Sequence, residues 1–229
     1  MDADSIVQQT LRKYSQCSTY SDEGCIETAG FGRPGILFKT DYVRPSLFRF
    51  EWRSWHPFFG RIAPEYYNVI GADERGAYEF YDWSFGLGLS FKRRCKTLAL
   101  AIAGATGISQ GAAYLVSSLV MPLVVLRDRK ETLTLYDAEF LPVEPGSFGG
   151  CYHIRCNQRE DFVHEFWIDR DDFSLRKILT EFSTTKEKES ASLLLKTAAL
   201  LCPRICTEYV FNKAVFNQPI AESVFLCEK

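Results

Sequence analysis

The sequence has few of the side chains that most enzymes and metalloproteins use. It contains three histidines, His56, His153 and His164, among 229 residues, which leaves few choices for acid–base or metal chemistry. Its eight cysteines form no C-x-x-C pair, which excludes the thioredoxin and common zinc-knuckle patterns. The chain has 27 Lys and Arg against 29 Asp and Glu, a formal net charge of −2. This charge gives no overall positive electrostatic potential to attract nucleic acid, and we expect no nucleic-acid partner.

The chain also lacks internal repeats, a Pro- or Ser-rich linker and a signal peptide. Residues 2–14 are charged and polar, with Ile6, Val7, Leu11 and Tyr14 at helical spacing, so they predict a first helix and not a leader. We therefore expect one domain over residues 1–229. We expect either a cytoplasmic protein or an exported one whose signal peptide is not included in the sequence.

Short aromatic runs with period-two alternation predict a mainly β fold. Residues 36–43 and 47–52 alternate most clearly, with Arg44 and Pro45 between them. One face of these two runs carries Ile36, Phe38, Thr40, Tyr42, Phe48, Phe50 and Trp52. Residues 17–28 predict a strand or a loose hairpin, and further strands are predicted at 66–70, 77–83, 131–138, 151–157, 162–169, 174–182 and 207–216. This spacing favours an antiparallel meander over βαβ units.

Two segments depart from the β pattern. Residues 97–126 contain no charged residue and no histidine, which is long enough to consider a membrane span. Gly104, Gly107 and Gly111 interrupt the segment, so a helix–turn–helix pair is favoured. Residues 186–203 begin with a Lys/Glu run and predict an apolar helical insert. The fold class is therefore α+β.

The turn from Gly107 to Gly111 matches G-x-S-x-G, the nucleophile elbow of serine hydrolases, with Ser109 as the nucleophile. An acid and a histidine follow in the right order, as Asp128 or Asp137 and then His153 or His164. The elbow needs a strand before it, whereas Leu98 to Ala103 is Ala-rich and helical in character. An interhelical turn is the favoured interpretation, and a serine hydrolase is the alternative.

Two other clusters admit a chemical interpretation. Cys151, His153, Cys156 and His164 are soft ligands within fourteen residues, but strand alternation points Cys156 away from Cys151 and His153. We expect ordinary sheet residues, no metal and no cofactor.

The second cluster is basic. Lys92, Arg93, Arg94 and Lys96 precede the uncharged segment; they are either a solvated charge run or a transient contact with anionic membrane headgroups.

Several motifs, in order along the chain, resemble the bacterial outer-membrane lipoprotein carriers (LolA/LolB-like). The motifs are Phe38–Glu51, Asn68–Gly71 with Ala77–Tyr81, Trp167–Asp169 with Leu175–Lys177, and Phe216–Ile220 with Phe225. The resemblance covers most of the chain and identifies it as a distant member. It implies an incomplete, half-open antiparallel β-barrel with a helical lid at about residues 97–126.

The resemblance also implies non-enzymatic binding and transport of lipid or acylated lipoprotein in an apolar cavity, in the periplasm or cell envelope, by a monomer. The implied cavity residues are Phe38, Tyr42, Arg44, Phe48, Phe50, Trp52, Ile102, Leu115 and Leu119. Arg44 matches the arginine that tethers the closed lid in that family. Export would also allow disulfides, with Cys17–Cys25 and Cys202 or Cys206 with Cys227 as candidates. A structural envelope protein whose interior is filled by its own side chains remains a further alternative.

Overall fold

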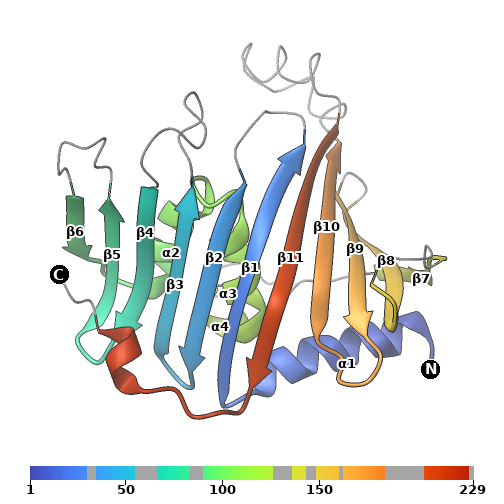
Figure 1. The fold of residues 1–229 in the computed structure, drawn as a ribbon, viewed down its shortest axis with the longest axis horizontal. Coiled ribbons are helices and arrows are strands. Elements are labelled where there is room, and N and C mark those ends of the chain that lie inside the picture. The colour runs from blue at the N-terminus through green and yellow to red at the C-terminus, as the bar shows by residue number, and fades with distance from the viewer. Residues whose placement is uncertain are drawn as a thin grey trace.

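Eleven strands form one open antiparallel sheet in the computed structural model, which describes residues 1–29, 35–54, 66–82, 90–125, 136–142, 148–159, 162–183 and 204–226 (Figure 1). The strands are β1 (Thr19–Ala29), β2 (Ile36–Val43), β3 (Leu47–Ser54), β4 (Tyr66–Asp73), β5 (Gly76–Asp82), β6 (Ser90–Arg94), β7 (Tyr136–Phe140), β8 (Cys151–Arg159), β9 (Phe162–Asp169), β10 (Leu175–Ser183) and β11 (Arg204–Phe216). Their order across the sheet is β6-β5-β4-β3-β2-β1-β11-β10-β9-β8-β7.

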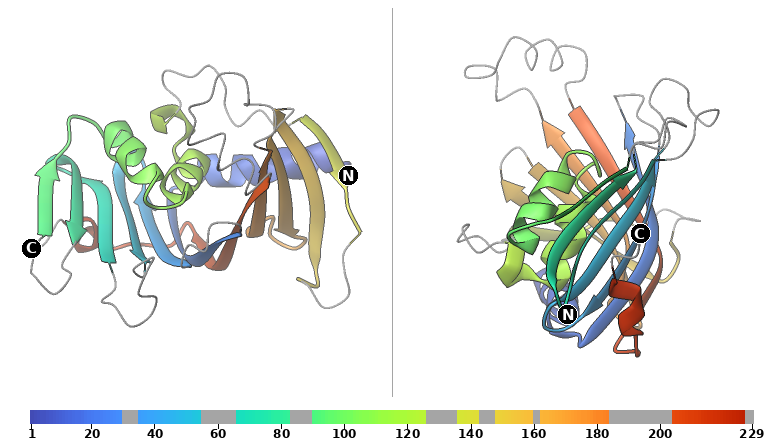
Figure 2. Two further views of the ribbon diagram at one scale, coloured as in Figure 1. Left: turned by 90° about the horizontal axis from the view of Figure 1, so that it is seen from above. Right: turned by 90° about the vertical axis from the view of Figure 1, so that its left-hand side faces the viewer.

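The strand order explains the shape of the molecule. Strands consecutive in sequence are neighbours in the sheet, except that β6 and β7 lie at opposite edges, and β1 pairs with β11 at the centre. The sheet curves into a trough whose two edges, β6 and β7, do not meet, and helices lie inside the trough (Figure 2). The predicted α+β, half-open antiparallel barrel with helices over its inner face is therefore confirmed.

The first helix, α1 (Ala3–Gln16), lies along the inner face. Asp2 caps it, because its Oδ1 accepts a hydrogen bond of 2.8 Å from the Ser5 backbone N–H. The buried Tyr14 ring contacts Tyr20 and Phe216 at centroid distances of 5.3 and 5.0 Å. Its hydroxyl accepts a hydrogen bond from the Leu175 backbone N–H at 3.0 Å. These contacts fasten α1 to the inner side of three neighbouring strands, β1, β11 and β10.

The uncharged segment forms α2 (Leu98–Thr106), α3 (Ala112–Val120) and the short α4 (Pro122–Val125). Thr97 caps α2 by accepting from the Leu100 N–H at 3.2 Å. The turn between α2 and α3 contains Gln110 and Gly111, both with positive φ (53° and 91°). The predicted helix–turn–helix is confirmed, and none of the described helices is long and apolar enough to cross a membrane.

Two strands differ from the sequence prediction. The charge run predicted at Lys92–Lys96 begins within the edge strand β6, which covers Ser90–Arg94. The strand predicted at 131–138 is described only from Tyr136 and extends to Phe140 as β7. The predicted helical insert at 186–203 lies outside the described residues.

The tail after β11 crosses the outer side of the sheet and ends in a short 3-10 helix, Glu222–Phe225 (η2). Thr19 donates a hydrogen bond to the Gln218 carbonyl at 2.6 Å, and Tyr78 donates to the Phe225 carbonyl at 2.9 Å. Phe225 itself is 1% exposed. The helices and the tail therefore cover opposite faces of the same strands.

Candidate functional site on the concave face

An aromatic layer lines the concave face of β1–β5 and β11. The rings contact one another within and between strands, with centroid distances of 6.0 Å for Phe38 of β2 and Phe50 of β3, 5.5 Å for Phe50 and Trp52 of β3, and 6.1 Å for Trp52 and Tyr81 of β5. Phe211 of β11 extends the layer, 5.9 Å from Phe38. The strand register places these side chains on one face, as the sequence alternation predicted.

The helices cover this layer with small and aliphatic side chains. Their inner faces contribute Ala101, Ile102, Ala105, Ala112, Ala113, Leu115, Val116 and Leu119 to the same buried cluster. Eight of the nine expected cavity residues belong to this cluster: Phe38, Tyr42, Phe48, Phe50, Trp52, Ile102, Leu115 and Leu119. Sequence reasoning missed Tyr81 and Phe211, although the alternation of β5 and β11 could have placed both on the inner face.

Arg44, the ninth expected residue, lies just after β2 and contacts a different helix from the one expected. Its Nε donates a hydrogen bond of 3.0 Å to the Cys17 carbonyl, and its Nη2 donates to the Ser15 carbonyl. A guanidinium at the carboxyl end of a helix is favourable because the last carbonyls lack partners there. Arg44 therefore caps α1, whereas the resemblance implied that it tethers the lid at residues 97–126.

A polar contact at the α2–α3 turn fastens the helices to the sheet. Tyr209 of β11 donates a hydrogen bond of 2.9 Å to the Gln110 carbonyl, and Thr28 of β1 donates one of 2.6 Å to the Gln110 side-chain oxygen. A Cβ at Gly111 would lie 2.8 Å from the Tyr209 hydroxyl, so glycine permits this close approach. We call these contacts of Tyr209 and Thr28 with Gln110 the turn latch.

Asp22 is a buried carboxyl in the centre of the concave face. Tyr20 donates a hydrogen bond of 2.6 Å to its Oδ2. Removal from water raises the pKa of Asp22 to about 7, although the neighbouring polar groups of Thr40 and Tyr20 act in the opposite direction. The inner face thus holds a carboxyl that is protonated in mildly acidic solution.

Ser109 is fully buried in the turn between the two helices. Its hydroxyl accepts a hydrogen bond from the Ala113 backbone N–H at 3.1 Å and lies 3.4 Å from the Thr106 carbonyl. A helix precedes it, whereas a nucleophile elbow requires a strand. The G-x-S-x-G match is therefore explained by a turn that begins α3.

The cysteines and histidines do not converge. Cys156 of β8 and His164 of β9 are buried directly opposite each other. His153 lies on the other face of β8 from Cys156 and stacks on Trp167, with the ring centroids 4.1 Å apart. Burial raises the pKa of Cys156 to about 12 and lowers that of His164 to about 4. No group of three metal-ligating side chains occurs among the described residues.

Cys17 and Cys25, a candidate disulfide pair, are both free thiols. Cys17 precedes β1 and Cys25 lies well within it, so the extended strand holds them apart. This disulfide prediction is wrong.

Two side chains of the basic cluster form ion pairs within the protein. Arg94 forms an ion pair of 2.6 Å with Asp73, and Arg93 pairs with the buried Glu79. Lys92 and Lys96 are both exposed. Because β6 faces two acidic residues of β4 and β5, part of the positive charge serves to hold the edge strand.

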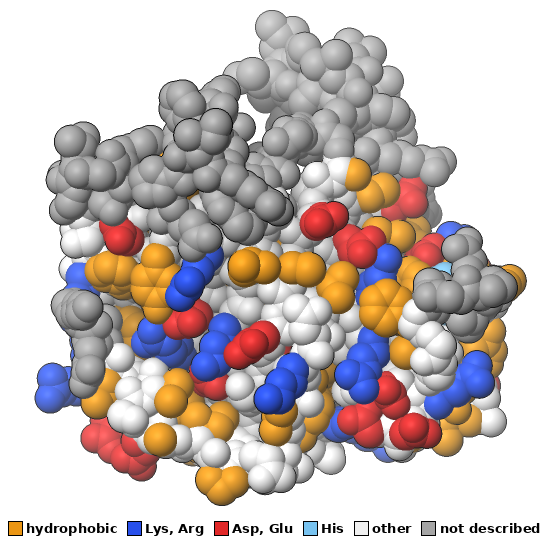
Figure 3. Space-filling model, viewed as in Figure 1, with side chains coloured by type: hydrophobic (Ala, Val, Ile, Leu, Met, Phe, Trp, Pro, Cys, Tyr) orange, Lys and Arg blue, Asp and Glu red, His pale blue; other side chains and the backbone are white. Residues whose placement is uncertain are grey.

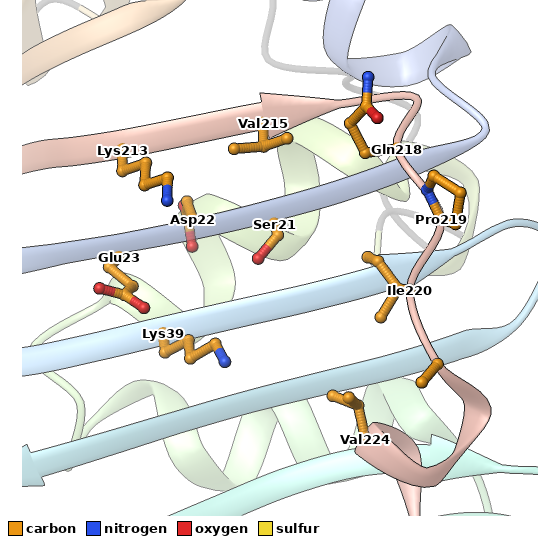
Figure 4. A pocket seen from close by; sticks show the side chains of 11 residues that line it. Ser21, Asp22, Glu23, Lys39, Lys213, Val215, Gln218, Pro219, Ile220 and Val224 are labelled. Carbon is orange, nitrogen blue, oxygen red and sulfur yellow. The ribbon is translucent and has the colours of Figure 1, made fainter.

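Two hollows open on the convex face. One of about 340 Å³ lies beneath the tail, with Lys39, Lys213, Val215, Ile220 and Val224 around it (Figure 4). The surrounding surface mixes cationic and anionic side chains over all the central strands (Figure 3). Such a surface suits contact with water, so the apolar face is the inner one.

Comparison with solved structures finds matches among bacterial proteins. A chain of the Pseudomonas aeruginosa MucA/MucB complex matches with a TM-score of 0.47 and 12% identity over 99% of this chain and 61% of that one. LprF from Mycobacterium bovis matches with a TM-score of 0.44 and 6% identity, over 96% of this chain and 97% of that one. A LolA superfamily protein from Nitrosomonas europaea matches with a TM-score of 0.32 and 11% identity, over 99% of this chain and 98% of that one.

The last of these proteins carries the name of the group that the sequence motifs resemble. No protein-family model matches the sequence, and no curated protein matches it.

Proposed function

We propose that this protein binds acyl chains of lipids or lipoproteins between the concave face and the helices α2–α4, and carries them without chemical change. The observation that carries the proposal is the separation of the apolar interior into two layers. One is an aromatic sheet face, and the other is a charge-free helical layer joined to it through small side chains. Helices that leave the sheet would expose a long apolar trough.

The driving force would be burial of the acyl chain. Each methylene contributes about 0.8 kcal/mol, so a long chain supplies roughly 8–12 kcal/mol before the cost of ordering it. In the closed arrangement the helices occupy the same apolar face, and displacing them offsets part of this gain. The bound chain would remain releasable to an acceptor.

The proposal includes the periplasm or cell envelope as the compartment and a monomer as the working form. It also includes transient membrane contact near Lys92, Arg93, Arg94 and Lys96. All four side chains are exposed, and Lys96 lies close in sequence to the exposed Leu100 at the start of α2. The two ion pairs formed by Arg93 and Arg94 reduce the charge available for that contact.

A structural protein with a filled core is the second candidate, favoured by the burial of all eight expected apolar residues. A fluorescent sixteen-carbon fatty acyl probe separates the two. A carrier shows saturable fluorescence enhancement with the detergent-free protein, at about one probe per chain. No enhancement at micromolar protein, with intact folding by circular dichroism, would favour the structural protein.

A further inference from the structure

Unpartnered polar atoms are concentrated on the concave face. Among the described residues, five buried side-chain polar atoms lack a hydrogen-bond partner, and four of them belong to Asp22, Thr40, Trp52 and Asn68. All four side chains are at most 4% exposed. A buried polar group without a partner costs roughly 1–3 kcal/mol, so four on one face need an explanation.

The four atoms form two cross-strand pairs. Asp22 of β1 lies directly opposite Thr40 of β2, and Trp52 of β3 lies directly opposite Asn68 of β4. Phe38 and Phe50, of β2 and β3, lie between the two pairs in the register of the sheet. Both pairs therefore interrupt the same aromatic layer that the proposed acyl site uses.

Each pair combines complementary hydrogen-bonding chemistry. Trp52 Nε1 is a donor and Asn68 Oδ1 is an acceptor; Thr40 Oγ1 can do both, and Asp22 Oδ1 accepts when ionised. Opposite as they are, the members of a pair do not make a hydrogen bond of normal geometry with each other. A group that offers both N–H and C=O, or a hydroxyl, would satisfy both members of a pair at once.

The electrostatics of this face restrict the ligand further. Arg93 and Glu79, charged side chains of the inner face of β5 and β6, are paired with each other. Arg44 donates to backbone carbonyls at the end of α1. A phosphate or carboxylate at the two pairs would therefore be buried without a cation to neutralise it.

We propose that the Asp22–Thr40 and Trp52–Asn68 pairs bind the uncharged polar linkage of the ligand, an amide or a hydroxyl adjoining the acyl chain. This inference rests on the proposed function and names the ligand class of the same site. In the closed arrangement α2 and α3 contribute apolar side chains to the buried cluster of this face, and the pairs have no partner. The ligand replaces those side chains with matching donors and acceptors.

Three sixteen-carbon ligands test this inference by displacement of the fluorescent acyl probe. N-methylpalmitamide offers N–H and C=O, methyl palmitate offers only acceptors, and palmitate carries a charge. The wild-type protein should bind the amide ~3–10-fold more tightly than the ester, since a net hydrogen bond is worth about 1 kcal/mol, and palmitate at pH 9 least tightly. Trp52→Phe and Asn68→Leu should each bring the amide-to-ester ratio near one.

Trp167→Phe is the matched control, because Trp167 stacks on His153 on the other face, and it should keep the wild-type ratio. Equal affinity of the wild type for amide and ester would overturn this inference while leaving the carrier intact. Failure of all three ligands and the probe to bind would overturn the proposed function and this inference together.

Thr40→Val gives a readout that does not depend on a ligand. Valine has nearly the same shape as threonine without the unpartnered hydroxyl, so Tm should rise by about 2–4 °C while the amide preference falls. A lower Tm together with an unchanged preference would show an ordinary core hydroxyl and would contradict the inference.

Discussion

Asp22 shows how one residue can set the pH response of the closed molecule. Burial raises its pKa from an ordinary value of 3.8 to about 7, so the folded state holds a proton that the unfolded state releases above about pH 4. Its stabilising contribution is complete below pH 4 and is lost as the pH rises to about 7. His164 contributes with the opposite sign, because its lowered pKa makes stability fall between about pH 6.5 and 4.

Asp22→Asn removes the ionisation while keeping the shape. Relative to the wild type, the variant should gain roughly 2–4 kcal/mol in the free energy of unfolding between pH 4 and pH 8, with the gain complete near pH 7. Urea denaturation across this range measures it. Asp171→Asn, on an exposed turn, is the control and should show no such trend. A pH-independent difference for Asp22→Asn would contradict the buried, protonated state.

Substitution of Ser109 distinguishes the proposed carrier from a serine hydrolase. Its hydroxyl accepts from the Ala113 N–H, so Ser109→Ala should cost about 1 kcal/mol of stability, as for a lost helix cap. Acyl-probe binding should be unchanged. A fluorophosphonate should not label the wild-type protein; labelling that disappears in Ser109→Ala would establish the hydrolase instead.

Residue-level prediction from the sequence succeeded where period-two alternation decides the face. Phe38, Tyr42, Phe48, Phe50 and Trp52 are all buried on the inner side. Alternation cannot tell which helix a residue meets, and Arg44 was therefore matched to the wrong helix. Whether the Oδ1 atoms of Asp22 and Asn68 find a hydrogen-bond partner depends on three-dimensional geometry, and no sequence pattern predicts it.

Among the elements, the α2–α3 pair is attached to β11 and β1 through the turn latch. Tyr209→Phe removes the hydrogen bond to the Gln110 carbonyl while keeping the ring. We expect ~3–10-fold faster amide hydrogen exchange in α2 and α3, since a hydrogen bond contributes about 1 kcal/mol, together with faster probe uptake. Tyr67→Phe removes an equivalent hydroxyl on the outer face and should change neither. Unaltered exchange in Tyr209→Phe would show that the latch does not hold the helices.

The tail is the element that secures the outer face. Phe225 is buried, and the Tyr78 hydroxyl donates a hydrogen bond to the Phe225 carbonyl. Gly71 leaves room for the Tyr78 side chain, because a Cβ at that position would collide with it. Phe225→Ala should lower the free energy of unfolding by about 3–5 kcal/mol, the usual cost of such a cavity. Leu226→Ala, next to it but exposed, should cost far less. Thermal unfolding of both variants checks this, and similar losses would mean that the tail is not anchored through Phe225.

A helix or strand could be predicted from the sequence where its own residue pattern determines it, and was missed where its pairing with a neighbouring strand determines it. The 36–43 strand and the 151–157 and 162–169 hairpin follow their own alternation and were predicted well. Strand β6 was missed because Ser90–Arg94 reads as a solvated charge run. Only its pairing with β5, and the contacts of Arg93 and Arg94 with Glu79 and Asp73, make it a strand.

At the scale of the whole molecule, the sheet leaves a trough that it cannot close by itself. Consecutive hairpins follow from the order of predicted strands, whereas the pairing of β1 with β11 joins the two halves and could not be read from local pattern. The helices complete the apolar interior without adding a strand. The proposed carrier requires these two layers to separate, whereas a filled barrel does not.

Lipid mass spectrometry on an organic extract of protein purified without detergent and incubated with bacterial lipid vesicles tests this account most directly. We predict acylated lipid at about one molecule per chain, absent from a size-matched control protein and reduced at least several-fold in Trp52→Phe. An extract with no lipid above the control, from protein that is folded and monodisperse, would contradict the carrier and establish a filled core.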